Sequence, residues 1–576
     1  MNLAAFKEIW VIDFEYQSLP GENPDPHCIV GLETITGKSI RMGAKELRSS
    51  KVPPFGIGSD SLVVAYYVPA EFSCFLELGW PCPENILDLC VEFKWLKSGV
   101  ADGLKRDLVA ALKHFRLDAT IPDAKDEWRQ LAIRGGPFTT PEMEGLMDYC
   151  AEDVYATAEL LTKMQPQIDL IRALIRGSYC WSVALMERAG VPVDMEALTL
   201  LWGQWSAIQS GLITATDKWE IYEGNTFKRD RFEAFLRDHK IQWPRLDSGQ
   251  LCLKDETFRQ QAKIHPRLIA PLHELRTTLG KLKLNSLAVG KDGRNRVMLS
   301  PFQSKTGRNQ PSNSKFIFGP ATWIRGLIKP GAGRAIAYID WSQQELGIAA
   351  RLSGDRNMME AYCSGDPYIT FARMAGAVPK DATKQSHPAE RSRYKQCMLA
   401  VQYGMGAESL AQTACLALLD AKVLLQAHRD AFPDYWKWSR QIEQQGFGNG
   451  ELRSAFGWRV LVNSDSRSAS VKNFPVQANG AEMLRLAIMK MHTAGIEVIA
   501  PVHDAVMIEA ASSEIETHTV KAQECMRWAS EQILPGFPLD SDAKIVKYPN
   551  RYMDEDRGTE MWNTVMGIAG GPLYTH

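Results

Sequence analysis

The chain has 576 residues, more than one hydrophobic core usually serves, so its length predicts two to four domains. It is 45% hydrophobic and 23% charged, and no apolar run approaches the roughly 20 residues that span a bilayer, so we expect a soluble cytoplasmic protein. The net charge of −2 excludes no class of partner, because a nucleic-acid enzyme can combine an acidic metal site with a basic groove. The eleven cysteines lack zinc-site spacing and are interpreted as reduced thiols.

The first part of the chain reads as an α/β layer domain. Short β-rich runs at residues 9–14 and 62–68 alternate with helical stretches at 104–115 and 141–164. From about residue 171 to 287 the apolar spacing predicts mostly helices, with basic residues at Lys228, Arg229, Arg231, Arg276, Lys281 and Lys283. A hypothesis motivated by Arg276, Lys281 and Lys283 is that the helical region holds a duplex through phosphate contacts, and the alternative for the basic residues is an ordinary solvated surface.

Strands return beyond residue 297. They are predicted at residues 335–339, 498–502 and 506–508, and a long helical insertion from about residue 366 to 445 separates the first from the other two. The sequence therefore predicts a sheet interrupted by a helical subdomain.

Carboxylates follow the first strand. The alternation of side chains along a strand places Asp13 and Glu15 on one face, where they repel each other unless a cation joins them. Downstream, Tyr149 and Asp153 align at i, i+4 on a helix expected to begin at residues 140–141. A phenol beside a carboxylate can position a water molecule.

A second set of acids lies in the later strands. Asp340 ends the apolar strand of residues 335–339, and His503 and Asp504 form the tip of a predicted hairpin. Between these two segments, cationic, apolar and aromatic side chains recur every four residues on one helix face that begins near residues 387–388: Arg391, Lys395, Leu399 and Tyr403. Two cations and an aromatic ring along one helix suit a triphosphate and a base.

In this order the three later segments resemble motifs A, B and C of family A DNA polymerases, the family of bacterial DNA polymerase I. Thr306-Gly307-Arg308 and Asn473-x-Pro475-x-Gln477 fall where that family has them, and the earlier acids resemble those of DEDDy 3′–5′ exonucleases. The resemblance covers nearly the whole chain. It implies an α/β multidomain fold, in which an RNase H-like exonuclease domain is followed by a right-hand polymerase of palm, fingers and thumb.

The same resemblance sets the expected domain boundaries. The exonuclease domain would comprise residues 1–168, the thumb 169–295, the palm 296–360 and 451–576, and the fingers 361–450. No 5′ nuclease domain is expected, as in many phage or element-borne members of the family.

The resemblance assigns roles to the polymerase residues. Asp340 and Asp504 would ligate two Mg²⁺ ions, and Lys395 would also donate a proton or positive charge to the leaving pyrophosphate. Glu345 would exclude a ribose 2′-hydroxyl. The expected contacts to nucleotide, primer and template are Arg391, Lys395, Leu399, Tyr403, Glu345, Gln343, Arg308, Asn473, Gln477 and His503.

In the exonuclease domain the metal ligands would be Asp13, Glu15, Glu71 and Asp153, with Tyr149 beside the attacking water. The usual Asn-x-x-x-Phe/Tyr-Asp segment is replaced by residues 68–74. Glu71 is chosen as the third acid because it precedes Leu78-Gly79 and residues 86–88 at the family's intervals. Glu77 and Asp88 are its rivals.

Four polymerase positions depart from the family pattern. Leu399 stands where Phe or Tyr is usual, Ala505 replaces the acid after His-Asp, Gly347 replaces an arginine, and Trp341 replaces Tyr or Phe. Position 505 is therefore not expected to be an essential ligand.

The implied function is template-directed DNA synthesis with proofreading, two Mg²⁺ ions at each site, and Mn²⁺ as a substitute. Expected partners are primer-template DNA, deoxynucleoside triphosphates and single-stranded 3′ ends. The chain is expected to be a monomer of phage or mobile-element origin, and whether it uses a processivity factor is left open. Three alternatives stand: a repair enzyme dominated by proofreading, a non-catalytic DNA-binding scaffold, and an RNA polymerase, against which Glu345 and the exonuclease acids argue.

Overall fold

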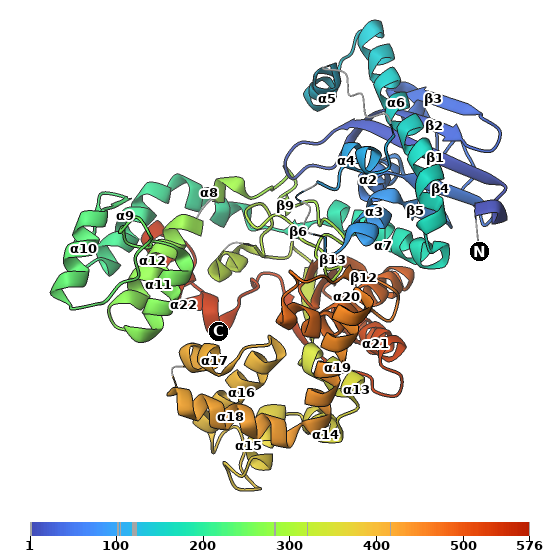
Figure 1. Cartoon of the computed structure of the whole chain (residues 1–576). Coiled ribbons are helices and arrows are strands. Elements are labelled where there is room, and N and C mark those ends of the chain that lie inside the picture. The colour runs from blue at the N-terminus through green and yellow to red at the C-terminus, as the bar shows by residue number, and fades with distance from the viewer. Residues whose placement is uncertain are drawn as a thin grey trace.

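The computed structural model describes residues 3–100, 103, 105–117, 124–281, 284–319, 321–414 and 416–574. Figure 1 shows an N-terminal α/β unit, a helical arm, a C-terminal sheet unit and a helical insertion that extends from that sheet unit. Within the described residues no single helix is long and apolar enough to cross a membrane, although the bent pair α17 (Ala407–Ala414) and α18 (Leu418–Ala431) together passes that test of length and composition.

The N-terminal unit is built on a five-stranded sheet. Its strand order is β3-β2-β1-β4-β5, with β1 antiparallel to β2 and parallel to β4. The strands are β1 (Glu8–Gln17), β2 (Asp25–Glu33), β3 (Ser39–Gly43), β4 (Ser61–Ala65) and β5 (Ile86–Asp88). The surrounding helices are α1 (Ala44–Ser49), α2 (Val68–Leu78), α3 (Leu89–Lys97), α4 (Leu108–His114), α5 (Ala124–Arg134), α6 (Thr140–Met164) and α7 (Leu170–Ala189).

Local backbone chemistry sets the boundaries of these elements. The predicted helix at 141–164 is confirmed, since Thr139 caps the N-terminus of α6 and Pro141 occupies its first turn. The strand predicted at 62–68 is too long: it ends at Ala65 because Tyr67 takes a left-handed φ of 76° and Val68 begins α2. The helix predicted at 104–115 begins only at Leu108, where Asp107 caps it, and Leu104 lies outside the described residues.

The helical arm follows α7. Its helices are α8 (Met195–Gly203), α9 (Trp205–Thr216), α10 (Arg229–Asp238), α11 (Asp255–Ile264) and α12 (Ile269–Lys281). Its short strands are β7 (Tyr222–Glu223) and β8 (Thr226–Phe227), and β6 (Val191–Pro192) pairs with β9 (Arg294–Asn295) at its base. The last helix of the chain, α22 (Glu555–Ala569), packs on α8 and α9.

Arg276 holds the core of the arm together. Its guanidinium lies 5.1 Å from the ring centre of Phe227 and 4.7 Å from that of Phe258, and it donates a hydrogen bond to the Leu253 carbonyl. The structure therefore gives Arg276 a packing role, and the phosphate contact hypothesised from the sequence stays a prediction. The side chain of Lys281 and the whole of Lys283 lie outside the described residues.

The C-terminal sheet is antiparallel, with the order β13-β14-β10-β15. Its strands are β10 (Arg334–Trp341), β13 (Glu497–Val502), β14 (Ala505–Ala511) and β15 (Ser541–Lys547), so the three predicted strands are confirmed. The helix α21 (Ile515–Ile533) packs across β10, β14 and β15, and α20 (Ser468–Thr493) packs against β13. In β10 the side chains of Ala335, Ala337 and Ile339 are fully buried, whereas Tyr338 and Asp340 on the other face are only partly buried.

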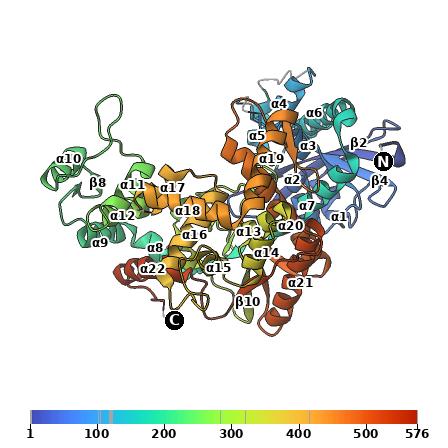
Figure 2. The same cartoon turned by 60° about the horizontal axis from the view of Figure 1, so that its bottom comes forward.

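The helical insertion lies between β10 and β13. It contains α13 (Gln344–Ser353), α14 (Arg356–Cys363), α15 (Pro367–Met374), α16 (Pro388–Gln402), α17 (Ala407–Ala414), α18 (Leu418–Ala431) and α19 (Pro433–Asn449), followed by the hairpin of β11 (Glu451–Arg453) and β12 (Arg459–Leu461). In Figure 2 the helix α11 of the arm lies beside α17, and residues of these two helices line a shared cavity of about 500 Å³.

Hydrogen bonds fix the N-terminal unit to the C-terminal half. The Trp95 indole N–H donates to the Gly457 carbonyl at 2.8 Å, and the guanidinium of Arg459 lies 4.4 Å from the Trp95 ring centre. The Leu461 amide donates to the Ser98 carbonyl at 2.8 Å. The β11–β12 hairpin is therefore docked on α3.

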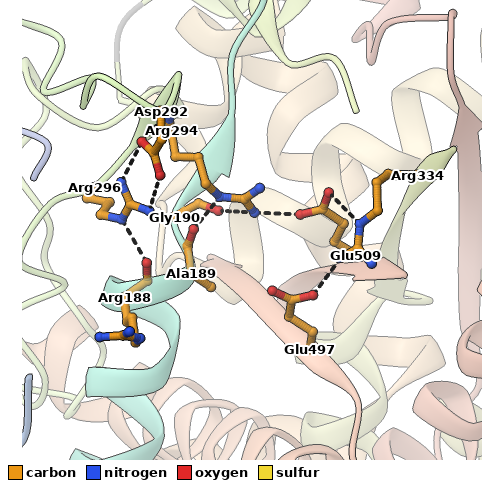
Figure 3. A network of polar contacts seen from close by, with 9 residues as sticks. All are labelled: Arg188, Ala189, Gly190, Asp292, Arg294, Arg296, Arg334, Glu497 and Glu509. Atoms are coloured by element: carbon orange, nitrogen blue, oxygen red, sulfur yellow. Dashed lines mark hydrogen bonds and ion pairs between the residues drawn. The ribbon is translucent and has the colours of Figure 1, made fainter. Parts of the chain in front are cut away.

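A second network joins α7, the base of the arm and the C-terminal sheet (Figure 3). Arg294 donates to the Gly190 carbonyl at 2.9 Å and to the carboxylate of Glu509 at 2.5 Å. Glu509 is only 2% exposed and also accepts from Arg334 at 3.2 Å. Arg296 donates to the Arg188 carbonyl at 2.7 Å. The buried carboxylate of Glu509 accepts hydrogen bonds from both Arg294 and Arg334, and Arg294 also binds the Gly190 carbonyl after α7. These contacts hold the end of α7 to β14 and β10.

The described cysteines, ten in all, are free thiols and eight of them are buried, in agreement with the prediction from their spacing.

We predict that the buried ion pair between α3 and α7 is sensitive to the loss of one partner. Arg176 donates two hydrogen bonds of 2.7 Å to Glu92, and the two side chains are 6% and 1% exposed. Arg176→Met leaves a buried carboxylate alone and should lower the free energy of unfolding by about 3–5 kcal/mol, measured by urea denaturation.

The matched control is Lys7→Met, which breaks the exposed pair with Asp60 and should leave stability unchanged. Glu92→Leu with Arg176→Met should be more stable than Arg176→Met alone, because no charge remains buried. Equal stability of Arg176→Met and Lys7→Met would contradict this account.

A second prediction concerns His428 in the helical insertion, which is 1% exposed and accepts a hydrogen bond from the Trp436 indole on Nδ1. Burial lowers the pKa of His428 to about 3 from its ordinary 6.5. The unfolded chain therefore takes up a proton here below pH 6.5 while the folded chain does not, so stability falls by up to about 1.4 kcal/mol per pH unit.

His428→Gln should reduce the slope of unfolding free energy against pH between about 6.5 and 4.5, whereas His239→Gln, at an exposed histidine, should leave it unchanged. An unaltered slope in His428→Gln would show that the folded protein already binds this proton.

Candidate active sites

The first candidate site lies where β10 meets the hairpin of β13 and β14. Asp340 pairs across the sheet with Ala505, the first residue of β14, and only His503 and Asp504 separate β13 from β14. His503 takes a left-handed φ of 59° in this two-residue turn. Because Asp504 precedes Ala505, the structure brings the two predicted carboxylates to adjacent strand ends.

The electrostatics at Asp340 favour a cation. Its Oδ1 is buried and has no hydrogen-bond partner among the described residues. Burial, followed by the charges of Asp504 and Asp542, raises the pKa of Asp340 to about 7. A divalent cation that takes oxygen ligands would satisfy the orphaned oxygen and offset the repulsion, so the residues present fit Mg²⁺ or Mn²⁺.

The helix α16 presents the predicted stripe. One of its faces is buried through Tyr394, Cys397, Met398 and Val401. The opposite face carries the four partly or fully exposed residues Arg391, Lys395, Leu399 and Tyr403. Pro388 begins the helix, and Gly404 follows it with a φ of +68°, where an added Cβ would lie 2.6 Å from that of Ala469. The close approach of α20 therefore requires glycine at this helix end.

The cations of this face have aromatic and acidic neighbours. Arg391 pairs with Asp366 at 2.5 Å. The Arg391 guanidinium lies 5.3 Å, and the Lys395 ammonium 5.6 Å, from the ring centre of Tyr368. Tyr368 thus holds both charges beside each other.

Glu345 and Gln343 lie at the start of α13. Glu345 pairs with Arg308 at 3.0 Å, and Gln343 takes a φ of 53° as it begins the helix. Burial, followed by the charge of Glu345, raises the pKa of Tyr403. Three predicted contact residues, Arg308, Glu345 and Tyr403, therefore face one another.

Two cavities connect the remaining predicted residues. Arg308, Gln477 and His503 line a cavity of about 620 Å³, and Tyr403, Asn473 and Gln477 line one of about 910 Å³. Gln477, on α20, belongs to both. Five of the predicted nucleotide and primer contacts therefore lie around two adjoining cavities: Arg308, Tyr403, Asn473, Gln477 and His503.

One carboxylate at this site was missed from the sequence. Asp542 on β15 is the direct cross-strand partner of Asp340 and accepts a hydrogen bond from the Ser342 hydroxyl at 2.7 Å. Nothing in the spacing of residues 340 and 542 indicates that these two strands pair.

The second candidate site lies at the end of β1. Ligand atoms of Asp13, Glu15 and Cys150 lie within 4.8 Å of one another. The Cys150 thiol donates to the Asp13 carbonyl at 3.1 Å. Cys150 was interpreted from the sequence only as a buried thiol, although it lies three residues before Asp153 on α6, which is the spacing of one helix face.

Glu71 on α2 faces the same acids. It is 4% exposed and accepts a hydrogen bond of 2.7 Å from the Phe14 amide, which lies between Asp13 and Glu15 in β1. Burial, followed by the charge of Asp13, raises the pKa of Glu71, and Glu15 and Asp153 contribute in the same direction. Burial and then Asp153 raise the pKa of Tyr149. The structure therefore brings all five predicted residues together.

The rivals of Glu71 have other partners. Glu77 pairs with Arg188 at 2.6 Å on the far end of α2. Asp88 accepts hydrogen bonds from the Val91 and Val68 amides, both at 3.0 Å, and so caps α3 and the start of α2.

Parts of the chain are similar to known DNA polymerases. The sequence profile described as DNA polymerase family A matches residues 314–548. The chain is similar to the thermostable DNA polymerase I of Thermus thermophilus, with 27% identity over 382 residues, 61% of this chain and 45% of that protein. It is also similar to DNA polymerase I of Aquifex aeolicus (23% identity, 69% of this chain and 75% of that protein) and to the DNA polymerase of Mycobacterium phage L5 (24%, 64% and 62%). The match spans about half the length of the Thermus protein.

A solved structure resembles nearly the whole chain. The POL domain of Pol1 from M. smegmatis, in complex with DNA primer-template and dNTP, superposes with a TM-score of 0.72 at 18% identity, covering 93% of this chain and 94% of that one. This likeness confirms the predicted α/β multidomain fold. The region that matches the DNA polymerase family A profile, residues 314–548, includes Asp340, α16 and the turn with Asp504.

Proposed function

We propose that the chain is a template-directed DNA polymerase that extends a primer 3′ end with deoxynucleoside triphosphates. The observation that carries this proposal is the pair Asp340 and Asp504 at adjacent strand ends, with Tyr403, the last residue of the α16 stripe, close enough to Asp504 that its charge adds to the effect of burial in raising the pKa of Tyr403. The C-terminal sheet is then the palm, the helical insertion the fingers and the helical arm the thumb. The M. smegmatis POL domain is in complex with primer-template and dNTP, which supports the same substrates here.

Asp340 and Asp504 would hold two divalent ions, which supply charge neutralisation for the attacking 3′ oxygen and the leaving pyrophosphate. Arg391 and Lys395 would bind the triphosphate, and Lys395 would give a proton or positive charge to the leaving group. Since Arg391 pairs with Asp366 in the structure, binding of the triphosphate would exchange one anionic partner for another.

The contact residues would position the nascent base pair. Tyr403 would stack beside it, and Glu345, held by Arg308, would stand where a ribose 2′-hydroxyl would have to fit. Asn473, Gln477 and His503 line the two cavities and would contact the primer end or the minor groove, where acceptor patterns are shared among base pairs. Leu399 and Gln343 would complete the nucleotide pocket.

We further propose a 3′–5′ exonuclease at the second site. The supporting observation is that Asp13, Glu15, Glu71 and Asp153 lie together with Tyr149, although they come from β1, α2 and α6. The four acids would hold two divalent ions that supply an activated water, and Tyr149 would orient that water beside Asp153. The alternative of a non-catalytic DNA-binding scaffold is less favoured, because all acids required at both sites are present.

We predict that the two activities separate by mutation. Asp504→Asn should abolish extension of a 5′-labelled primer on a longer template while sparing degradation of single strands, and Asp13→Asn should do the reverse. The two variants serve as controls for each other on one gel. A single substitution that removed both activities from a folded chain would refute the two-site arrangement.

A further prediction tests the third exonuclease acid. Glu71→Gln retains an acceptor for the Phe14 amide but loses the charge, so degradation of a single-stranded oligonucleotide should slow at least about tenfold, or 1.4 kcal/mol in activation free energy. The matched control is Glu77→Gln on the same helix, which should degrade the oligonucleotide at the parent rate. The choice of Glu71 would be wrong if Glu77→Gln were the slower enzyme.

A further inference from the structure

The register of the C-terminal sheet places three residues side by side across its strand ends. Asp340 on β10 pairs with Ala505 on β14 and with Asp542 on β15. Directly paired residues in an antiparallel sheet project to the same face, with Cβ atoms about 4.5–5.5 Å apart. Asp542 therefore projects to the face of Asp340, whereas β14 offers only the methyl group of Ala505 at the equivalent position.

The carboxylate of Asp542 is held in place. The Ser342 hydroxyl donates to its Oδ2 at 2.7 Å, and the Ser342 amide donates to the Asp540 carbonyl at 2.9 Å. The Ser342 carbonyl in turn accepts a hydrogen bond from the Tyr362 hydroxyl at 3.0 Å. The turn after β10 is thus fixed to β15, and it orients Asp542 at the open edge of the site.

In the part of the chain that the structure describes, no protein cation balances these acids. Among the described residues, none of Asp340, Asp504 and Asp542 forms an ion pair with a lysine or arginine, although the neighbours Asp540 and Lys544 are both paired, with Arg527 and Glu555. Three carboxylates without a counter-charge repel one another, and the buried Oδ1 of Asp340 lacks a hydrogen-bond partner within the described ranges. A divalent cation that keeps several waters satisfies both conditions.

We propose that Asp542 contributes a third carboxylate to the site of the divalent ions held by Asp340 and Asp504. It would bind an ion directly or through a water molecule that the ion holds. The proposal rests on the proposed polymerase function for its chemical purpose. On one side of Asp340, β15 supplies the carboxylate of Asp542, whereas on the other side β14 has only the uncharged Ala505.

The test is Mn²⁺ binding to the full chain, measured by the electron paramagnetic resonance signal of free Mn²⁺ without DNA or nucleotide. All variants carry Asp13→Asn, so that binding at the exonuclease acids is weakened equally throughout. Asp542→Asn keeps the acceptor for the Ser342 hydroxyl and removes the charge. It should weaken Mn²⁺ binding about 10-fold or more. Asp340→Asn should also weaken it, and Asp542→Glu should restore part of the affinity.

The matched control is Asp540→Asn, two residues away and exposed, which should leave Mn²⁺ affinity unchanged. The proposal is overturned if Asp542→Asn binds Mn²⁺ like the parent while Asp340→Asn does not. It is also overturned if Ser342→Ala loses as much affinity as Asp542→Asn, since Asp542 would then only order the turn. Primer extension by the parent chain is measured in parallel: its absence, with Mn²⁺ binding still dependent on Asp542, would reject the polymerase function and retain the metal site.

Discussion

The polymerase site depends on the repulsion of carboxylates that a β-sheet register forces together. β10 runs between β14 and β15, and its last residues deliver Asp340 to the same edge as the turn that carries Asp504. The face beneath is closed by α21, so the acids can project only toward the open side. This geometry costs free energy in the absence of a cation, which is consistent with the raised pKa of Asp340. Binding of a divalent ion at this edge would relieve that cost.

At the proposed exonuclease site, carboxylates are also brought together, but from different kinds of element. There the acids come from one strand and two helices, and the third, Glu71, is almost fully buried against the backbone of β1. The hydrogen bond from the Phe14 amide favours the charged form of Glu71, whereas burial and the neighbouring acids oppose it. The docking of α3 on the β11–β12 hairpin and the Arg294–Glu509 network hold both sites in one body, so a primer end would move between fixed positions.

Short-range patterns in the sequence predicted much of this arrangement. The i, i+4 stripe of α16, the strand ends at Asp13 and Asp340, and the helix start at residue 140 each follow from local periodicity and capping, and each is present. Contacts set by distant pairing could not be predicted in this way. The partnership of Asp340 with Asp542 depends on strand register over two hundred residues of chain, and Cys150 joins Asp13 only through the packing of α6 on β1. The packing of Arg276 between aromatic rings of the same arm is another contact that the spacing of basic residues did not predict.

The most direct test of the account is anomalous diffraction from crystals of the full chain grown with primer-template DNA and Mn²⁺. The account predicts Mn²⁺ peaks at two separate places, one beside Asp340 and Asp504 and one beside Asp13 and Glu15. A peak at only one of these places, or cations bound away from both carboxylate sets, would contradict it.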